Sequence, residues 1–136
     1  MSKSLYVCSN DPRCGKSSVV LGMMESLLKN IPKVAFFRPI INEPRGSARL
    51  DHDIELIRTY FKLDMPYEDM YAYTFQEATD LIAHGRKTEL LEGILGKFSR
   101  LEATHDFVIC EGAEFESLAN SIEFDLNADI HINLNC

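Results

Sequence analysis

The sequence predicts a single α/β domain built on a parallel sheet, and two observations lead to this prediction. A short apolar run, Leu5 to Cys8, precedes a polar turn and then a segment whose apolar residues recur at helical spacing. A second apolar run follows at 33–38, and a strand, a helix and a strand in this order form a βαβ unit with parallel strands. The chain has 136 residues, 46% of them hydrophobic, which is enough for one domain over 1–136 and too little for two.

The polar turn after the first strand predicts a phosphate-binding loop. Gly15, Lys16 and Ser17 match the end of the pattern G-x-x-x-x-G-K-[ST] between a strand and a helix. Backbone N–H groups and the positive helix end would face an anion, Lys16 would reach the terminal phosphates, and Ser17 could bind Mg²⁺. Asn10 stands where the pattern has its first glycine, but asparagine tolerates a left-handed backbone well. The alternative is a Gly-Lys-Ser that merely starts a helix, and we favour the phosphate loop because of its context.

We assign phosphate or nucleotide binding to the loop and to the first helical turn. The assigned residues are Asn10, Asp11, Cys14, Gly15, Lys16, Ser17 and Ser18. Cys14 has two interpretations. It is either a reactive thiol, since a thiol beside a helix amino terminus can have a lowered pKa and oxidise readily, or a tolerated spacer. Cys8 and Cys110 are interpreted as small core residues on strands.

The second strand is predicted to end at Arg38-Pro39, at the edge where ligands bind to parallel sheets. Arg38 either holds a phosphate or a carboxylate there or is a solvated strand end, and we add it to the phosphate-binding set. A loop is predicted for 42–49, followed by a helix for which Asp51 is well placed as the N-cap. One side of this helix carries Ile54, Ile57, Tyr60 and Phe61.

Two acidic residues are candidate metal ligands together with Ser17. Asp53 lies in the first turn of that helix, where a carboxylate is favoured even without a metal, so it either stabilises the helix or binds Mg²⁺. A third strand within 105–112 ends near Glu111, and an acid at this place in a phosphate-loop protein helps to hold Mg²⁺ or its waters. The alternative for Glu111 is a solvated strand terminus. We favour the metal role because the strand needs a place beside the first one.

Periodicity predicts the other elements. Residues 63–73 are predicted to be irregular, Thr74 starts a short helix that stops at Gly85, and Thr88 caps a longer helix. The longer helix has an apolar stripe that we expect to pack against the sheet as core: Leu90, Leu91, Ile94, Leu95, Phe98 and Leu101. The last stretch, 124–134, fits both a strand and a helix. Because three sure strands are few for such a sheet, we expect the chain to be a fragment of a longer polypeptide.

Composition excludes several classes of protein. The formal net charge of −7 and the lack of a basic face argue against a nucleic-acid partner. No apolar run approaches the roughly 18 residues of a membrane span and no amino-terminal apolar signal is present, so we expect a cytoplasmic protein without a membrane partner. The four cysteines and four histidines are too dispersed to predict a metal site.

Several segments together resemble a known family. In order they are "GKSSVVLGMMESL", "VAFFRPI", "DHDIELIRTYFKL", "PYEDMYAYTFQEA", "LIAHGRKTELLEGI", "HDFVICEG" and "FDLNADI". They are similar to the amino-terminal domain of long phosphate acetyltransferases, which is itself similar to dethiobiotin synthetase, a phosphate-loop enzyme. The resemblance implies a parallel, Rossmann-like P-loop sheet of the dethiobiotin synthetase type, flanked by helices and truncated at the carboxyl terminus. It also implies that the Glu111 strand lies between the other two and that the last stretch is helical.

The same resemblance implies a site and its cofactors. It places Lys16 on the phosphates of ATP, or of another nucleotide, and Ser17, Asp53 and Glu111 around Mg²⁺. Arg38 stands where dethiobiotin synthetase has a substrate-side lysine. Because Arg38 and Asn10 depart from that enzyme, we do not expect its ligation reaction and assign no catalytic residue.

The function implied by the resemblance is that of a regulatory or oligomer-forming, nucleotide-binding-like domain. The parent enzyme would interconvert acetyl-CoA and phosphate with acetyl phosphate and coenzyme A through a separate carboxyl-terminal domain. The expected partners are a nucleotide or small-molecule effector and further copies of the parent enzyme, as a homo-oligomer. Two alternatives stay open: an ATP- and Mg²⁺-dependent carboligase or amidoligase, and a structural oligomerisation module with a non-functional loop.

Overall fold

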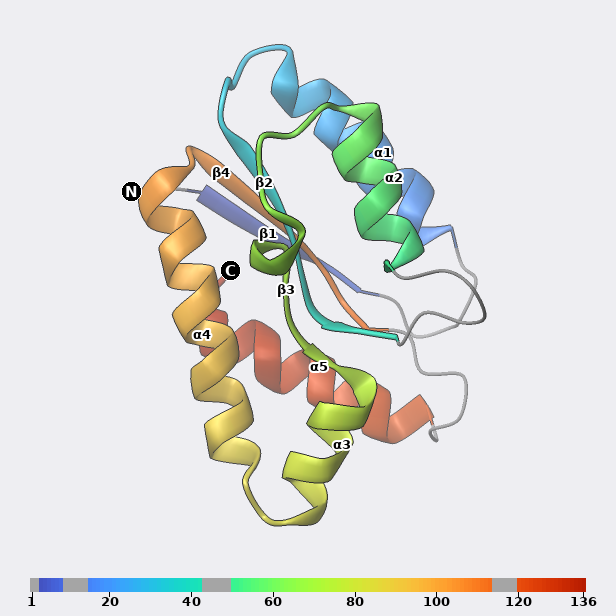
Figure 1. Ribbon diagram of the computed structural model, residues 1–136, viewed down its shortest axis with the longest axis vertical. Coiled ribbons are helices and arrows are strands. Elements are labelled where there is room, and N and C mark those ends of the chain that lie inside the picture. The colour runs from blue at the N-terminus through green and yellow to red at the C-terminus, as the bar shows by residue number, and fades with distance from the viewer. Residues whose placement is uncertain (1–2, 9–14, 43–49, 114–119) are drawn as a thin grey trace.

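A sheet of four parallel strands forms the centre of the domain, with the strand order β1-β4-β2-β3 (Figure 1). The computed structural model describes residues 3–8, 15–42, 50–113 and 120–136, with the side chains of 120–124 left aside. The strands are β1 Lys3–Val7, β2 Val34–Ile41, β3 Tyr71–Thr74 and β4 Phe107–Glu111. The α/β fold with a parallel sheet is therefore confirmed, and so is the position of the Glu111 strand between the first two.

Helices cover both faces of this sheet, with α1 and α2 on one side and α3, α4 and α5 on the other (Figure 1). They are α1 Lys16–Leu28, α2 His52–Tyr60, α3 Phe75–Ala83, α4 Lys87–Thr104 and α5 Asn120–Leu134, with a 3₁₀ turn, η1, at Tyr67–Asp69. The last stretch is thus helical, as the resemblance implied. No helix in the described ranges is long and apolar enough to cross a membrane.

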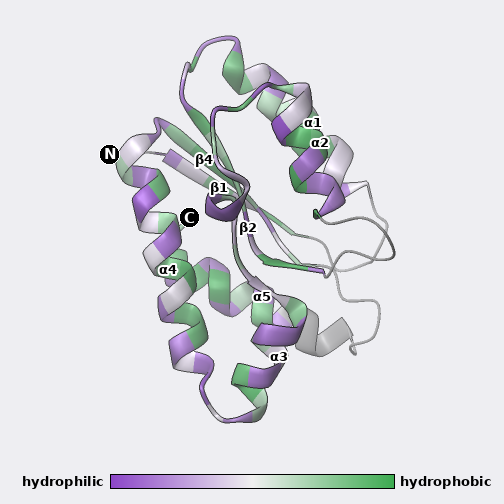
Figure 2. Ribbon diagram, viewed as in Figure 1, coloured by the Kyte–Doolittle hydropathy of each residue, from purple (hydrophilic) through white to green (hydrophobic). Residues whose placement is uncertain are grey.

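The hydrophobic core lies on both faces of β2, whose eight residues are all buried. Phe36 and Phe37 are fully buried and, as neighbours in a strand, point to opposite faces. Phe37 meets Phe98 of α4 with ring centroids 6.4 Å apart, so Phe36 faces the layer of α1 and α2. Figure 2 shows the resulting pattern, in which apolar residues lie along the strands and polar residues mark the outer sides of the helices.

The strand β2 does not end at Arg38-Pro39, as the sequence predicted, but continues to Ile41. Arg38 donates its backbone N–H to the Met70 carbonyl at 2.8 Å, on the β3 side. The missing N–H of Pro39 therefore falls on the β4 side, where the pairing with β4 has already ended at Phe37. The proline is tolerated because it removes no hydrogen bond from the ladder.

The partner that extends β2 is β3, which the sequence analysis missed within the stretch predicted to be irregular. This strand has four residues, too few for a clear alternating pattern. Two predicted helix starts are confirmed. Asp51 caps α2 by accepting the Ile54 N–H, and Thr74 caps α3 in a reciprocal pair with Glu77.

Three local predictions are wrong. The N-cap of α4 is Arg86 rather than Thr88, because Gly85 takes a left-handed φ of 69° and lets the chain turn directly into the helix. Leu95 belongs to the stripe of α4 that was predicted to pack against the sheet, but it is 36% exposed. Cys110 is buried in β4 as predicted, but Cys8 follows β1 and is exposed.

We predict that Gly112→Ala destabilises the domain by roughly 1–3 kcal/mol through overpacking. A Cβ at this position would lie 2.9 Å from Asn127 Oδ1 and 2.9 Å from Cys8 Cβ. Asn127 cannot shift cheaply, because its Oδ1 accepts hydrogen bonds from Tyr6 Oη at 2.8 Å and from the Ala113 N–H at 3.1 Å. Urea unfolding measures the effect.

The matched control is Gly96→Ala on the exposed side of α4, where a Cβ meets nothing within 4 Å. This change should raise the free energy of unfolding by roughly 0.5–1 kcal/mol, because alanine is the better helix former. An unchanged unfolding midpoint for Gly112→Ala would contradict the prediction. It would show that the Asn127 side chain makes room for the added methyl group without a loss of stability.

Candidate functional site

The start of α1 carries the described part of the predicted phosphate loop. Gly15 is the N-cap of α1 with φ 85° and ψ 18°, a left-handed conformation that explains why glycine stands there. Lys16 is 5% exposed and Ser17 is half-buried at the same helix end. Ser18 is exposed, and its N–H donates to the Gly15 carbonyl at 3.1 Å.

The remaining predicted loop residues, Asn10, Asp11 and Cys14, lie outside the described residues. Their assignment to phosphate binding stays a prediction.

Three oxygen-bearing side chains from three different elements converge beside this helix end. Ser17 Oγ of α1 lies 3.3 Å from Asp53 Oδ2 of α2 and 3.4 Å from Glu111 Oε1 of β4. The parallel order of β1, β4 and β2 explains this meeting, because the carboxyl ends of neighbouring parallel strands share one edge of the sheet. The structure thus brings together all three residues predicted to surround a metal.

The chemistry of this donor set fits Mg²⁺. Hydroxyl and carboxylate oxygens are its preferred ligands, and Mg²⁺ is usually bound through one or two carboxylates together with phosphates and waters. Within the described part of the chain, no three or more His, Cys, Asp or Glu residues gather as a metal site of their own. Ser17, Asp53 and Glu111 are therefore suited to hold a metal that arrives with further oxygen ligands.

Arg38 is a buried cation at the centre of the site rather than a solvated strand end. It is 4% exposed, and its Nη1 lies 2.9 Å from both carboxylate oxygens of Asp51. The same Nη1 is 3.4 Å from Asp53 Oδ2, and Nε is 4.0 Å from Glu111 Oε2. Burial alone would lower the pKa of Arg38, but the three carboxylates outweigh it and raise the pKa. The interpretation of Arg38 as a solvated strand end is therefore wrong. The carboxylates that it contacts belong to its own chain, and its assignment to phosphate binding stays a prediction.

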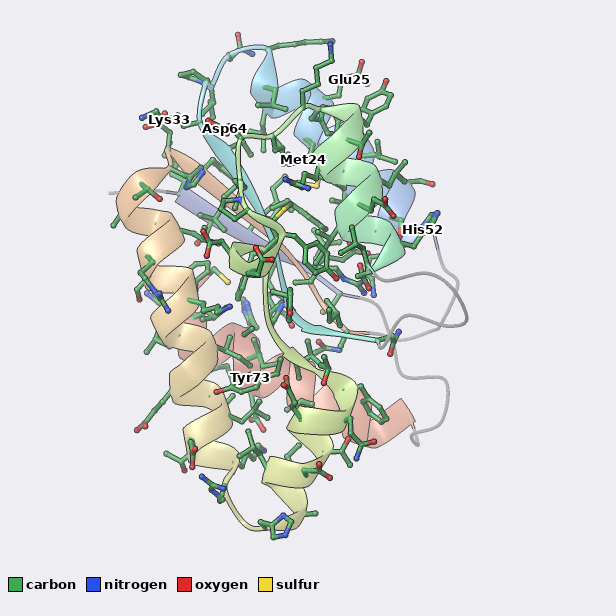
Figure 3. All side chains as sticks on the ribbon, viewed as in Figure 1. Met24, Glu25, Lys33, His52, Asp64 and Tyr73 are labelled. Atoms are coloured by element: carbon green, nitrogen blue, oxygen red, sulfur yellow. The ribbon has the colours of Figure 1, made fainter. Side chains whose placement is uncertain are left out.

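Asp51 connects Arg38 to the start of α2. Its Oδ1 accepts the Ile54 N–H at 3.1 Å as the helix cap, while its own N–H donates to Tyr67 Oη at 2.8 Å. Figure 3 marks this end of α2 with His52, the first residue of the helix. Because Asp53 follows in the same turn, the pairing of Arg38 with Asp51 fixes where the Asp53 carboxylate lies.

The anchoring role of Asp51 and Tyr67 was not predicted from the sequence. Asp51 was predicted only as a cap, and Tyr67 lay in the stretch predicted to be irregular. A signal was present in "VAFFRPI", because an arginine inside a run of buried strand residues requires a buried carboxylate partner.

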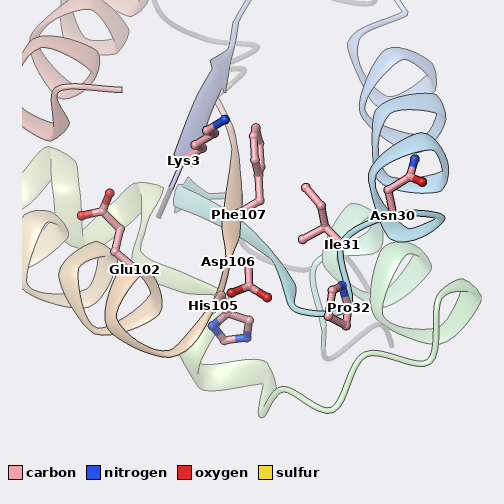
Figure 4. A pocket seen from close by; sticks show the side chains of 8 residues that line it. All are labelled: Lys3, Asn30, Ile31, Pro32, Glu102, His105, Asp106 and Phe107. Atoms are coloured by element: carbon pink, nitrogen blue, oxygen red, sulfur yellow. The ribbon is translucent and has the colours of Figure 1, made fainter. Parts of the chain in front are cut away.

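A cavity at the opposite edge of the sheet is separate from this site (Figure 4). It has a volume of about 540 Å³ and lies where β1 and β4 begin, with Lys3, Glu102, His105 and Asp106 among its lining residues. None of the residues that converge on Ser17 lines it.

Glu111 is the most deeply buried acid of the site, with 1% of its surface exposed. Burial raises its pKa to about 7; Asp53 and Asp51 add to the shift, while Arg38 and Lys16 act against it. An ionised Glu111 is therefore costly near neutral pH unless an additional cation lies beside it.

We predict that this carboxyl group makes the stability of the domain fall as pH rises. The native state holds the Glu111 proton up to about pH 7, whereas the unfolded chain releases it near 4.5. The unfolded chain binds fewer protons between these values, so the free energy of unfolding falls across this window, by at most about 3 kcal/mol. Glu111→Gln should lack this contribution, which urea unfolding with a chelator at about pH 5 and about pH 8 would measure.

Glu92→Gln on the exposed side of α4 is the control and should keep the pH dependence of the wild type. If Glu111→Gln and the wild type lose the same stability between the two pH values, the raised pKa of Glu111 is wrong.

Comparison with known proteins agrees with this architecture. The chain matches the family AAA_26, described as an AAA domain, over residues 3–136. It is 52% identical over 136 residues to a phosphate acetyltransferase of Nitratidesulfovibrio vulgaris and 38% identical over 136 residues to one of Synechocystis sp.. Each alignment covers 100% of this chain and 19% of the acetyltransferase. An ATP-dependent dethiobiotin synthetase of Clostridium kluyveri is 25% identical over 121 residues, 83% of this chain and 49% of that enzyme.

These relatives confirm the resemblance found in the sequence. The chain spans about a fifth of the length of the phosphate acetyltransferases that it matches. The family match includes α1, which carries Ser17, and β4, which carries Glu111. The chain therefore belongs to the AAA_26 family, and it has phosphate acetyltransferases and, more distantly, dethiobiotin synthetase among its relatives.

Proposed function

We propose that this chain is the nucleotide-binding regulatory domain of a phosphate acetyltransferase. The observation that carries the nucleotide part is the convergence of Asp53 Oδ2 and Glu111 Oε1 on Ser17 Oγ, at 3.3 and 3.4 Å, beside Lys16 at a helix amino terminus. A phosphate loop has this combination of a cation, a helix end and metal-binding oxygens. ATP with Mg²⁺ is the ligand that it fits best.

Each residue has a separate task in this proposal. The Lys16 ammonium binds the terminal phosphates, and the amino-terminal end of α1 adds the electrostatic attraction of its N–H groups. Ser17, Asp53 and Glu111 hold Mg²⁺, which would neutralise the phosphate charge. Arg38 holds Asp51 at 2.9 Å and so keeps Asp53 facing Ser17. No residue is assigned to a chemical step.

The pattern of relatives supports a part in acetyl phosphate metabolism. Identity to the two acetyltransferases is 52% and 38%, against 25% to the dethiobiotin synthetase. Because the chain matches 19% of either acetyltransferase, we place the exchange of acetyl-CoA and phosphate with acetyl phosphate and coenzyme A in the remainder of the parent enzyme. The domain would then control that reaction or assemble the parent into a homo-oligomer.

A second candidate function is an ATP- and Mg²⁺-dependent carboligase or amidoligase. The dethiobiotin synthetase match over 83% of this chain favours it. Arg38 weakens it, because this side chain is buried against Asp51 rather than presented to a second substrate. ATP hydrolysis that a carboxylic acid or a diamine stimulates would support the ligase. A structural module with a non-functional loop would instead sediment as an oligomer regardless of nucleotide.

We predict that Lys16→Ala weakens binding of ATP with Mg²⁺ to the full-length protein about tenfold to a hundredfold. A hydrogen bond to a charged group contributes roughly 1.5–3 kcal/mol, which corresponds to that range. Isothermal titration calorimetry measures it. Lys29→Ala, at the exposed far end of α1, removes the same charge and should bind as the wild type does. Equal affinities of the two variants would contradict phosphate binding by Lys16, and no binding by the wild type would contradict nucleotide binding itself.

The regulatory part has its own test in the acetyl-transfer rate of the full-length protein. We expect ATP to change the rate of the wild type and of Lys29→Ala by the same factor, and this factor to approach one in Lys16→Ala. The reason is that only Lys16 lies at the phosphate-binding end of α1. A rate that ATP leaves unchanged in the wild type, despite measurable binding, would contradict regulation through this site.

A further inference from the structure

We infer that Arg38 is an internal counter-cation that keeps the metal subsite closed to a free divalent ion, so that Mg²⁺ enters only together with nucleotide phosphates. The inference rests on the proposed nucleotide function and adds a control of metal entry to it. It assigns to Arg38 a specificity role that differs from direct contact with a ligand.

The first step is that Arg38 contacts the same carboxylates that would bind the metal. Asp53 Oδ2 lies 3.3 Å from Ser17 Oγ and 3.4 Å from Arg38 Nη1. Glu111 turns Oε1 toward Ser17 at 3.4 Å and Oε2 toward Arg38 Nε at 4.0 Å. An ion bound between Ser17, Asp53 and Glu111 would therefore sit next to the guanidinium, and like charges at such distances repel.

The second step is that Arg38 cannot withdraw from this place. Its Nη1 is held by both oxygens of Asp51 at 2.9 Å. Asp51 is itself fixed by the N–H of Ile54 and by Tyr67 Oη. The backbone N–H of Arg38 is part of the β2–β3 pairing. A guanidinium also keeps its proton under all physiological conditions.

The third step is the charge balance of the described residues around Ser17. Asp51 and Asp53 supply two negative charges, Lys16 and Arg38 supply two positive ones, and Glu111 adds one negative charge only when it is ionised. A lone divalent ion would therefore leave an excess of at least one positive charge. The phosphates of a nucleotide bring several negative charges, so the same ion then becomes favourable.

Arg38 Nε gives independent support. It is buried and has no hydrogen-bond partner among the described residues, and the nearest carboxylate oxygen is Glu111 Oε2 at 4.0 Å. A buried donor without an acceptor is costly. This donor therefore favours a Glu111 that stays near Arg38 and opposes the movement of Glu111 toward a lone metal.

The inference is tested with Mn²⁺ as the probe, by electron paramagnetic resonance of the full-length protein without nucleotide. The wild type should bind Mn²⁺ at this site at least tenfold more weakly than the double variant Arg38→Gln with Asp51→Asn. This double variant removes one positive and one negative charge, so its net charge is unchanged, and the two amide side chains can hydrogen-bond to each other in place of the ion pair and keep α2 on the sheet. Asparagine also remains a good cap for α2. Asp53→Asn added to it should abolish the gained Mn²⁺ binding.

The matched control is the double variant Arg86→Gln with Glu89→Gln. It removes an exposed ion pair at the start of α4, in which Arg86 Nη2 lies 2.7 Å from Glu89 Oε2. It should bind Mn²⁺ as the wild type does. Micromolar Mn²⁺ binding at this site by the nucleotide-free wild type would overturn the inference without recourse to any variant. Equal Mn²⁺ affinity of the wild type and the folded Arg38 and Asp51 double variant would overturn it as well.

The test separates this inference from the proposed function. If ATP does not bind the wild type but the Arg38 and Asp51 double variant gains Mn²⁺ affinity, the nucleotide proposal fails and the control of metal entry by Arg38 stands. If ATP binds and the Mn²⁺ affinities are equal, the nucleotide proposal stands and the control of metal entry by Arg38 fails.

Discussion

The buried ion pair between Arg38 and Asp51 is the interaction on which the site depends. An arginine with 4% of its surface exposed, inside a strand whose eight residues are all buried, would be strongly destabilising without a carboxylate partner. Asp51 supplies that partner at 2.9 Å and also caps α2. One pair of charges therefore holds α2 to the sheet and determines where Asp53 faces Ser17.

The concentration of charge at this edge of the sheet is difficult to explain by stability alone. Buried ion pairs often contribute no more to stability than well-packed apolar residues would. Glu111 adds a cost, since burial raises its pKa to about 7 and its ionised form is disfavoured. Ionisable groups with perturbed pKa values that gather beside a helix amino terminus are typical of functional sites. Under the proposed function, the same residues that weaken the domain would serve to bind a polyanion together with a cation.

Local chemistry made most of the fold predictable from the sequence. The spacing of apolar residues gave α1 and α4, and the capping residues Asp51 and Thr74 gave the starts of α2 and α3. β3 could not be found in this way, because it has four residues and owes its existence to β2 beside it. The site, too, has one part that local sequence predicts and another that depends on packing. Ser17, Asp53 and Glu111 were predictable as single residues, whereas the contacts that Arg38 makes arise only when β2 and α2 pack together.

The position of Arg38 also bears on why such a site could bind a nucleotide without using it in a reaction. By resemblance, dethiobiotin synthetase has a lysine on the substrate side at this position. Here the side chain is longer and always protonated, and its Nη1 binds both carboxylate oxygens of Asp51. The backbone N–H of Asp51 in turn donates a hydrogen bond to Tyr67 Oη. A group that could meet a second substrate is instead part of the framework that joins β2, α2 and η1. A change in the charge beside Arg38 would then act on the start of α2 and on the turn before β3, which is the physical coupling that a nucleotide-sensing domain requires.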